Sequence, residues 1–478
     1  MNNDIIFICN LFNVEPELIE SASLSKRNGE SIFDVRLNSF PSPCPSCGNE
    51  NVKIKGYVTK KINHSILCNQ KTSLIYHARR YVCPVCGKTY YERNPFVFKK
   101  MKISSEVVLS ILSDLTNPSE TFSSVANRYN LSPTTIASIF DTHVDIPRAC
   151  LPRILSIDEN YAFHSDDIGS KYICVFIDQR TGRPIDILPS RRFDYLDNYF
   201  KNVPKYEKDR VEIISTDMYE PYRRIIKKHF KHSLHVVDRY HVAQELHRKV
   251  DAVRLRIQNE YRNINKKYRT KEQEDAYYLL KYQHHLMFRH YTLAKGKDKK
   301  RLFDIERKRY YNQHFKQYMN PYDLAKKLVS IHPDLEKAWE LKDEVNDFYR
   351  TNTIDTAEEA LNVLMEKLRN SGIEELEHFA KTMFNWRKEI INSFTTSKAV
   401  YVVSNTTGKV HVDRKRVNNA LIENSNGVIK LLTKAANGYT NWPRFRNRCM
   451  LILEKDIGFE IDKKDGDVKL VEKKKPDK

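Results

Sequence analysis

The sequence predicts a multidomain α/β protein, and three observations carry that prediction. A five-residue cysteine pattern occurs twice, at residues 44–48 and 83–87. Runs of β-branched and aromatic residues, typical of strands, begin at about residue 151. From about residue 246 to 395 apolar residues recur at helical spacing, over a stretch too long for a loop. We therefore expect a small cysteine-rich module, a strand-rich domain and a helical block.

The chain is strongly basic. It has 81 Lys and Arg residues against 61 Asp and Glu residues, which gives a formal net charge of +20. A charge of this size favours an anionic polymer as partner, and we predict double-stranded DNA. The alternative is that lysine-rich loops and the charged tail, residues 456–478, only keep the protein in solution. That alternative explains the tail better than it explains the whole chain.

The N-terminal segment, residues 1–40, lacks the features of a targeting signal. Asp4 stands where a secretory signal would place Lys or Arg, and the apolar run around it is too short to span a membrane. We therefore expect a cytoplasmic protein with no membrane partner. Nine cysteines in such a chain favour metal binding or core packing over disulfides.

The repeated pattern, "CPSCG" and then "CPVCG", predicts a zinc-binding ribbon over residues 41–98. Two residues between thiolates let both sulfurs reach one tetrahedral ion, and the trailing glycine accepts a positive φ. Redox-active cysteine pairs or buried free thiols are the alternative. We predict one structural Zn²⁺ held by Cys44, Cys47, Cys83 and Cys86.

Other cysteines and histidines are not needed for this zinc site. Four thiolates complete a tetrahedral shell, so the residues between the two pairs are expected to play no part; these are His64, Cys68 and His77. The cysteines without a partner at ligand spacing are expected in the core; these are Cys9, Cys150, Cys174 and Cys449.

A helix-turn-helix module is predicted within residues 99–148. In "TFSSVANRYNLSPTTIASIFD" one amphipathic helix ends near Leu131, and Ser132 then caps a second helix. An ordinary helical hairpin is the alternative. The second helix presents short polar side chains suited to phosphates or base edges in a major groove; these are Thr134, Thr135 and Ser138.

Residues 151–245 predict the first part of an RNase H-like catalytic domain. Three strand-like runs come first, the second and third joined by a turn containing Gly and Pro, and then helix, strand, helix and strand follow. This element order is that of an RNase H-like fold. It places Asp158 on the first strand and Asp217 at the end of the fourth, close enough to share a metal site.

Paired carboxylates predict a divalent metal site. Hard oxygen ligands suit Mg²⁺ or Mn²⁺, and two such ions activate a nucleophile and stabilise the leaving oxygen in phosphodiester cleavage. For either Asp158 or Asp217 taken singly, a turn or cap residue is the better interpretation. As a pair in this element order, we interpret them as metal ligands.

The domain is interrupted by an all-α insertion, residues 246–395, and closes with residues 396–455. In the closing part, "ALIENSNGVIK" places Glu423, Asn426, Gly427 and Lys430 on one helical face. We predict that Glu423 is the third metal-ligand acid and that Lys430 holds a DNA phosphate. A solvated helix face is the alternative.

With these motifs in order, the chain resembles the ISL-three family of bacterial insertion-sequence transposases. The resemblance runs from about residue 40 to 455, through the "CPxCG" pairs, "LSIDEN", "STDMYEPYRR", "VVDRYHVAQ" and "ALIENSNG". It implies a DDE transposase that binds terminal inverted repeats, as a homodimer associated with the nucleoid, and that joins a freed 3′-hydroxyl to target DNA. It also implies site residues: the Mg²⁺-binding catalytic triad Asp158, Asp217 and Glu423, and the auxiliary residues Asp238 and His241.

Two other functions remain open on the sequence. A catalytically inert DNA-binding regulator descended from a transposase needs the zinc ribbon and the helix-turn-helix but none of the acids. A structure-specific nuclease shares the metal chemistry but gives no reason for two duplex-reading modules. Retention of all three acids favours the enzyme over the regulator.

Overall fold

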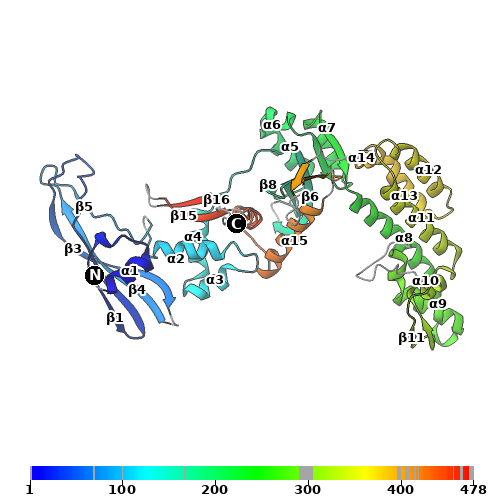
Figure 1. The fold of residues 1–478 in the computed structure, drawn as a ribbon, viewed down its shortest axis with the longest axis horizontal. Coiled ribbons are helices and arrows are strands. Elements are labelled where there is room, and N and C mark those ends of the chain that lie inside the picture. The colour runs from blue at the N-terminus through cyan, green and yellow to red at the C-terminus, as the bar shows by residue number, and fades with distance from the viewer. Residues whose placement is uncertain are drawn as a thin grey trace.

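The structure is a computed structural model that describes residues 3–67, 70–98, 101–165, 168–289, 305–395, 400–403, 410–413, 416–417, 419–455, 457–462 and 467–472. The molecule is elongated, with the N-terminal sheet at one end and the helical block at the other (Figure 1). The central sheet lies between them. No helix in these ranges is long and apolar enough to cross a membrane.

The N-terminal module is a twisted sheet with strand order β1-β2-β4-β3, extended by β5 on β4. One helix packs against it, and Ile8 and Phe12 of that helix join Phe33 and Tyr76 in a buried core. The residues before position 40 therefore share one sheet with the cysteine-rich residues after it. Its elements are α1 (Asn3–Phe12), β1 (Ile19–Arg27), β2 (Glu30–Leu37), β3 (Lys53–Leu67), β4 (Gln70–Val82) and β5 (Thr89–Tyr91).

Three short helices follow. The first two begin at capping residues, and the side chain of Ser132 accepts a hydrogen bond from the Thr135 backbone amide at the start of the third. Asn130, at φ 52°, turns the chain between the second and third helices. The third helix buries Ile136 and Phe140. The helices are α2 (Ser105–Asp114), α3 (Phe122–Tyr129) and α4 (Pro133–His143).

The central sheet has five strands in the order β10-β9-β6-β7-β8. The last three form an antiparallel meander, whereas β9 and β10 run parallel to β6 and are connected through helices. The elements follow one another as β6 (Ile154–Ser165), β7 (Ser170–Asp178), β8 (Pro184–Leu188), α5 (Phe193–Asn202), α6 (Lys205–Asp209), β9 (Ile213–Thr216), α7 (Glu220–His229) and β10 (Leu234–Val237).

Both faces of this sheet are covered by helices. The apolar side chains of β7 accordingly point to both faces and do not alternate with polar ones. Cys174 and Phe176 pack with α5 and α7, whereas Ile173 and Val175 belong to the core formed with two C-terminal helices. Those helices are α15 (Ala420–Ala435) and α16 (Trp442–Leu453).

The helical block lies between β10 and the C-terminal helices. It begins with α8, whose buried stripe includes Leu246, Val250 and Val253, and it forms its own core. After the block a short antiparallel pair leads towards α15. The elements are α8 (Arg239–Asn263), α9 (Lys271–Tyr282), β11 (Tyr310–Asn312), β12 (Gln317–Met319), α10 (Pro321–Val329), α11 (Pro333–Thr351), α12 (Ala357–Arg369), α13 (Glu374–Asn385), α14 (Arg387–Asn392), β13 (Val400–Val403) and β14 (Val410–Asp413).

Helix α16 joins the three short helices to the central sheet. Arg444 pairs with Asp141 of α4, while Arg446 pairs with Asp186 of β8. The fully buried Arg448 donates to the backbone oxygens of Asn117 and Glu120, in the connection between α2 and α3. Because a buried guanidinium must keep its hydrogen bonds, these contacts hold the helices and the sheet in one arrangement.

Candidate metal centres and nucleic-acid surfaces

The four predicted zinc ligands come together in the N-terminal module. Sγ atoms of Cys44 and Cys86 lie 3.5 Å apart, as do those of Cys47 and Cys83. All four sulfurs lie within 4.8 Å of one another, which suits a tetrahedral ion. The four-cysteine group therefore fits a structural Zn²⁺, as the sequence predicts.

Local backbone geometry prepares these cysteines to bind a cation. Gly48 and Gly87 adopt φ values of 73° and 70° and their amides donate to the carbonyls of Cys44 and Cys83. Backbone amides facing the sulfurs lower the pKa of the Cys83 thiol to about 6 and also lower that of Cys44. Part of the site is thus already poised as thiolate, the form that binds metal.

The remaining cysteines and histidines take other roles. Cys9, Cys174 and Cys449 are buried, as expected, but Cys150 is exposed, so the core prediction is wrong for that residue. Cys150 lies in the extended connection between α4 and β6, outside any helix or strand. The two described histidines between the cysteine pairs bind other groups: His64 contacts Ser104, and His77 pairs with Asp34. Cys68 lies outside the described residues.

Three acids meet at one edge of the central sheet. In the parallel pairings Ser156 lies opposite Ser215, and Val237 lies opposite Thr216. Asp158 and Asp217 lie two residues beyond the first pair, and Asp238 and Asp217 lie one residue beyond the second. The three acids are therefore side by side. The strand β6 itself continues past Asp158, because its pairing with β7 is longer than its pairing with β9.

Helix α15 brings Glu423 to the same edge. The backbone amide of Asn419, which precedes the helix, donates to Asp238 Oδ2 at 2.7 Å, and the Asn419 side chain accepts from Ser215 at 2.7 Å. Within the helix, Asn426 Nδ2 donates to Asp158 Oδ2 at 2.8 Å. These contacts fix the first two turns of α15, and Glu423 with them, against β6, β9 and β10.

The acids raise one another's pKa values. Burial and then the Glu159 carboxylate raise the pKa of Asp158 to about 7 and that of Asp217 to about 9. Burial and then Asp238 raise the pKa of Glu423. Carboxylates gathered in this way without a cation are costly, and a divalent ion would reverse these shifts.

The donor set fits a divalent ion. Asp217 Oδ1 is buried and has no hydrogen-bond partner within the described part of the chain, so a ligand position is available on that side chain. In those same ranges the four cysteines are the one group of three or more such ligands whose atoms all lie within 4.8 Å of one another. Within the described ranges the carboxylates of Asp158, Asp217 and Glu423 do not all lie that close to one another.

Asp238 and His241 occupy different positions around the acids. Both oxygens of Asp238 accept backbone hydrogen bonds, from Tyr240 at the start of α8 and from Asn419. Asp238 thus fastens α8 and α15 to the sheet edge. Burial lowers the pKa of His241, and its Nε2 is buried without a hydrogen-bond partner among the described residues.

Sequence reasoning missed the amide chain behind Asp158. Asn160 Nδ2 donates to the backbone oxygen of Asn426 at 2.9 Å, and Asn426 in turn donates to Asp158. The side chains of Asn160 and Asn426 are both buried. A buried Asn on an otherwise apolar strand is unusual. That polar residue on the Asp158 face of "LSIDENYAF" was the available signal.

We expect Asn426→Ala to weaken the site without unfolding the protein. The substitution removes the donor to Asp158 and the side-chain oxygen that Asn160 contacts at 3.3 Å, while the backbone oxygen that accepts from Asn160 remains. We expect a cost of about 1–3 kcal/mol. Thermal unfolding and metal-dependent thermal shifts measure the change, with the exposed neighbour Asn424→Ala as control. Equal behaviour of the two variants would contradict a positioning role for Asn426.

The predicted DNA-contact residues lie at the surface. Thr134 and Ser138 of α4 are exposed and Thr135 is partly exposed. Lys430 is exposed on α15, two turns beyond Glu423. Lys430 has no ion-pair partner among the described residues.

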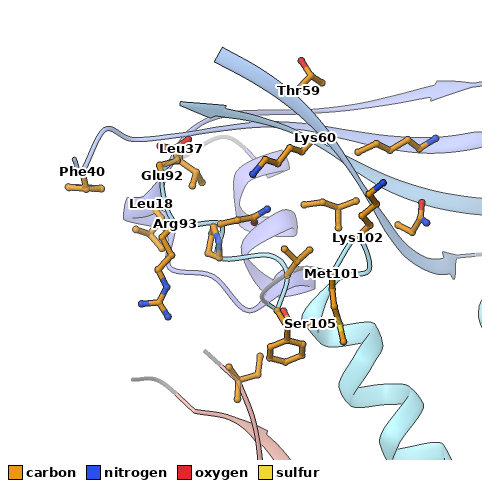
Figure 2. A pocket seen from close by; sticks show the side chains of 18 of the residues that line it. Leu18, Leu37, Phe40, Thr59, Lys60, Glu92, Arg93, Met101, Lys102 and Ser105 are labelled. Atoms are coloured by element: carbon orange, nitrogen blue, oxygen red, sulfur yellow. The ribbon is translucent and has the colours of Figure 1, made fainter. Parts of the chain in front are cut away.

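A basic cavity of about 1320 Å³ lies between the N-terminal sheet and α2. Lys60 extends from β3 and Lys102 from the segment before α2, and Arg93 lines the same space (Figure 2). Two acids line the cavity: Glu92, which pairs with Arg79, and Asp462. The cavity therefore has an excess of cations where the cysteine-rich module meets the three short helices.

The comparisons with known proteins agree with this architecture. None of the curated proteins compared with the chain matches it. The zinc-finger model of the transposases IS204, IS1001, IS1096 and IS1165 matches residues 41–86, which hold the four-cysteine group. The ISL3 transposase model matches residues 155–407, more than half of the 478 residues, and includes Asp158, Asp217 and His241 but ends before Glu423. The chain therefore belongs to the ISL3 family of transposases.

Proposed function

We propose that this transposase cuts and joins DNA through the acidic triad Asp158, Asp217 and Glu423. The observation that carries the proposal is the convergence of these acids, from β6, the end of β9 and α15, at one sheet edge. The sheet order and the connections through α5 and α7 support an RNase H-like catalytic domain, into which the helical block is inserted after β10.

The three acids would hold Mg²⁺ or Mn²⁺. Such ions supply charge for an attacking oxygen and for a leaving oxygen in phosphodiester chemistry. The chain's own groups prepare the site: Asn426 orients Asp158, and Asp238 fastens α15. His241 lies close enough to Asp238 and Glu159 for their charges to act on its pKa. Lys430 offers a cation for a neighbouring DNA phosphate.

The two N-terminal modules, within residues 41–148, would bind and recognise the DNA. Helix α4 of the proposed helix-turn-helix presents Thr134, Thr135 and Ser138. The basic cavity adds Lys60 from the zinc ribbon and Lys102 from the segment before α2. The contacts of α16 hold the three short helices at a fixed distance from the acids. The bases contacted by α4 and the phosphate that is cut would therefore keep one spacing along the DNA. We propose the terminal inverted repeats of the element as the site, bound by a homodimer.

A nicking assay tests this function. The protein is incubated with a labelled duplex carrying its own element's terminal repeat, with and without Mg²⁺ or Mn²⁺. We expect metal-dependent nicking at the element end, and binding that weakens steeply with salt because several Lys and Arg residues displace counterions. Affinity that stays flat between low and moderate salt would contradict the DNA-binding proposal.

The second candidate is a DNA-binding regulator that does not cut. It would bind the same repeat with the same salt dependence but leave the duplex intact with either metal. The polar support given to the acids by Asn160, Asn426 and Asn419 favours the enzyme, since a regulator has no use for it.

A further inference from the structure

Arg191 lies beside the acids in a cage built from four segments. It follows β8, and its guanidinium carbon is 4.4 Å from the ring centroids of both Tyr172 on β7 and Tyr219. Its Nη1 pairs with Glu159 on β6. Tyr219 follows Asp217 by two residues, so the guanidinium is held at the sheet edge where the acids gather.

The cage fixes the guanidinium but does not use all its donors. An arginine has five N–H donors in a planar fork. Within the described residues, the bond from Nη1 to Glu159 is the guanidinium's one hydrogen bond, and its side chain remains 24% exposed. Two aromatic rings set the plane of the fork, and the remaining donors are left for another group.

The surroundings indicate which group that is. A phosphodiester approaching Asp158, Asp217 and Glu423 meets negative charge, so a cation of the protein at that edge lowers the electrostatic cost. Guanidinium forks match phosphate oxygens in pairs. Tyr172 in turn contacts Tyr161, which is 60% exposed and whose ring lies edge-on to that of Tyr172 at 5.6 Å, so Tyr161 offers an aromatic surface for a nucleotide.

We infer that Arg191 binds the DNA phosphate at the cut site, held in place by Tyr172 and Tyr219 and exchanging part of its contact with Glu159 for the phosphate oxygens. This inference rests on the proposed function, because the phosphate is that of the DNA strand presented to the triad. A lysine cannot replace Arg191, since it has no planar group to stack between the rings.

Metal-free binding tests the inference without cleavage. The affinity for the terminal-repeat duplex is measured by fluorescence anisotropy for Arg191→Lys and for the matched control Arg192→Lys, whose side chain is 57% exposed and 4.0 Å from Asp194. Charge is unchanged in both variants. We expect roughly tenfold weaker binding for Arg191→Lys, the size of one lost charge-assisted hydrogen bond, and no change for the control. Equal affinities would overturn the inference.

A modified duplex identifies the phosphate. One neutral methylphosphonate replaces the phosphate at the cut position, which removes the charge that Arg191 would contact. Wild-type protein should lose affinity with this duplex, and Arg191→Lys should lose little more than it has already lost. If wild type and Arg191→Lys lose affinity by the same factor, Arg191 is not the partner of that phosphate.

The variant Glu159→Gln distinguishes an Arg191 that binds DNA from an Arg191 that only forms a structural ion pair with Glu159. Neutralising Glu159 frees the guanidinium, so we expect DNA affinity equal to or greater than that of wild type, opposite in sign to Arg191→Lys. Loss of affinity in both variants would overturn the inference in favour of a structural pair. Failure of the proposed function itself would show differently, as absence of duplex binding and nicking in the unmodified protein.

Discussion

Asp217→Asn is expected to abolish DNA cleavage and strand joining while DNA binding persists. The substitution replaces a partly buried carboxylate with a neutral amide where a divalent ion would bind. Metal-ion catalysis contributes several kcal/mol, and about 1.4 kcal/mol changes a rate tenfold, so the rate should fall by at least about 10³-fold. Nicking of the terminal-repeat duplex with Mg²⁺ or Mn²⁺ measures the rate, and anisotropy measures binding.

The control for this variant is Asp194→Asn. Asp194 is an exposed acid at the start of α5, and its substitution removes the same charge away from the triad. The control should cut at the wild-type rate. Without metal, Asp217→Asn should also have a higher free energy of unfolding than wild type. The pKa of the wild-type carboxyl is raised to about 9 in the folded protein, so its tendency to ionise opposes folding as the pH rises towards that value. Cleavage by Asp217→Asn at the wild-type rate would rule out the triad.

Cys83→Ala is expected to remove zinc and unfold the N-terminal module. Structural zinc contributes about 10–16 kcal/mol of apparent binding free energy at neutral pH, comparable to or greater than the stability of a typical domain. The zinc content should fall from one ion per chain to none, measured by elemental analysis. The module should become sensitive to limited proteolysis, and DNA affinity should fall with it.

The matched control is Cys150→Ala, because Cys150 is an exposed free thiol outside the four-cysteine group. It should retain zinc, protease resistance and DNA binding. A zinc-free wild-type protein with an intact N-terminal sheet would contradict the metal assignment. Loss of zinc in both variants would mean that general destabilisation, and not loss of a ligand, explains the result.

The local features of this protein were predictable from its sequence because each depends on nearby residues. The spacing of the cysteine pairs limits them to one tetrahedral ion, and the four sulfurs do come together. Ser132 and Pro133 mark the start of α4, and the structure begins that helix at Pro133. Runs of β-branched and aromatic residues located β6 and β7, since such residues favour strands wherever they lie in the chain.

Other features depend on residues that are distant in the chain. The amide of Asn426 reaches Asp158 across 268 positions, and no local pattern connects them. Cys150 was expected in the core, but burial depends on what packs over a residue and not on its type alone. Arg191 looks like one more surface arginine before a helix, and only the fold brings Tyr172, Tyr219 and Glu159 around it.

The sequence by itself determined the modules, their order and the residue types available for metal and DNA. Propensity, capping and ligand spacing act over a few residues, so they can be read along the chain. The tertiary structure alone decided which acids share one edge, which polar groups support them and which arginine faces them. Those relations come from strand register and helix packing, which bring together side chains that are tens to hundreds of positions apart.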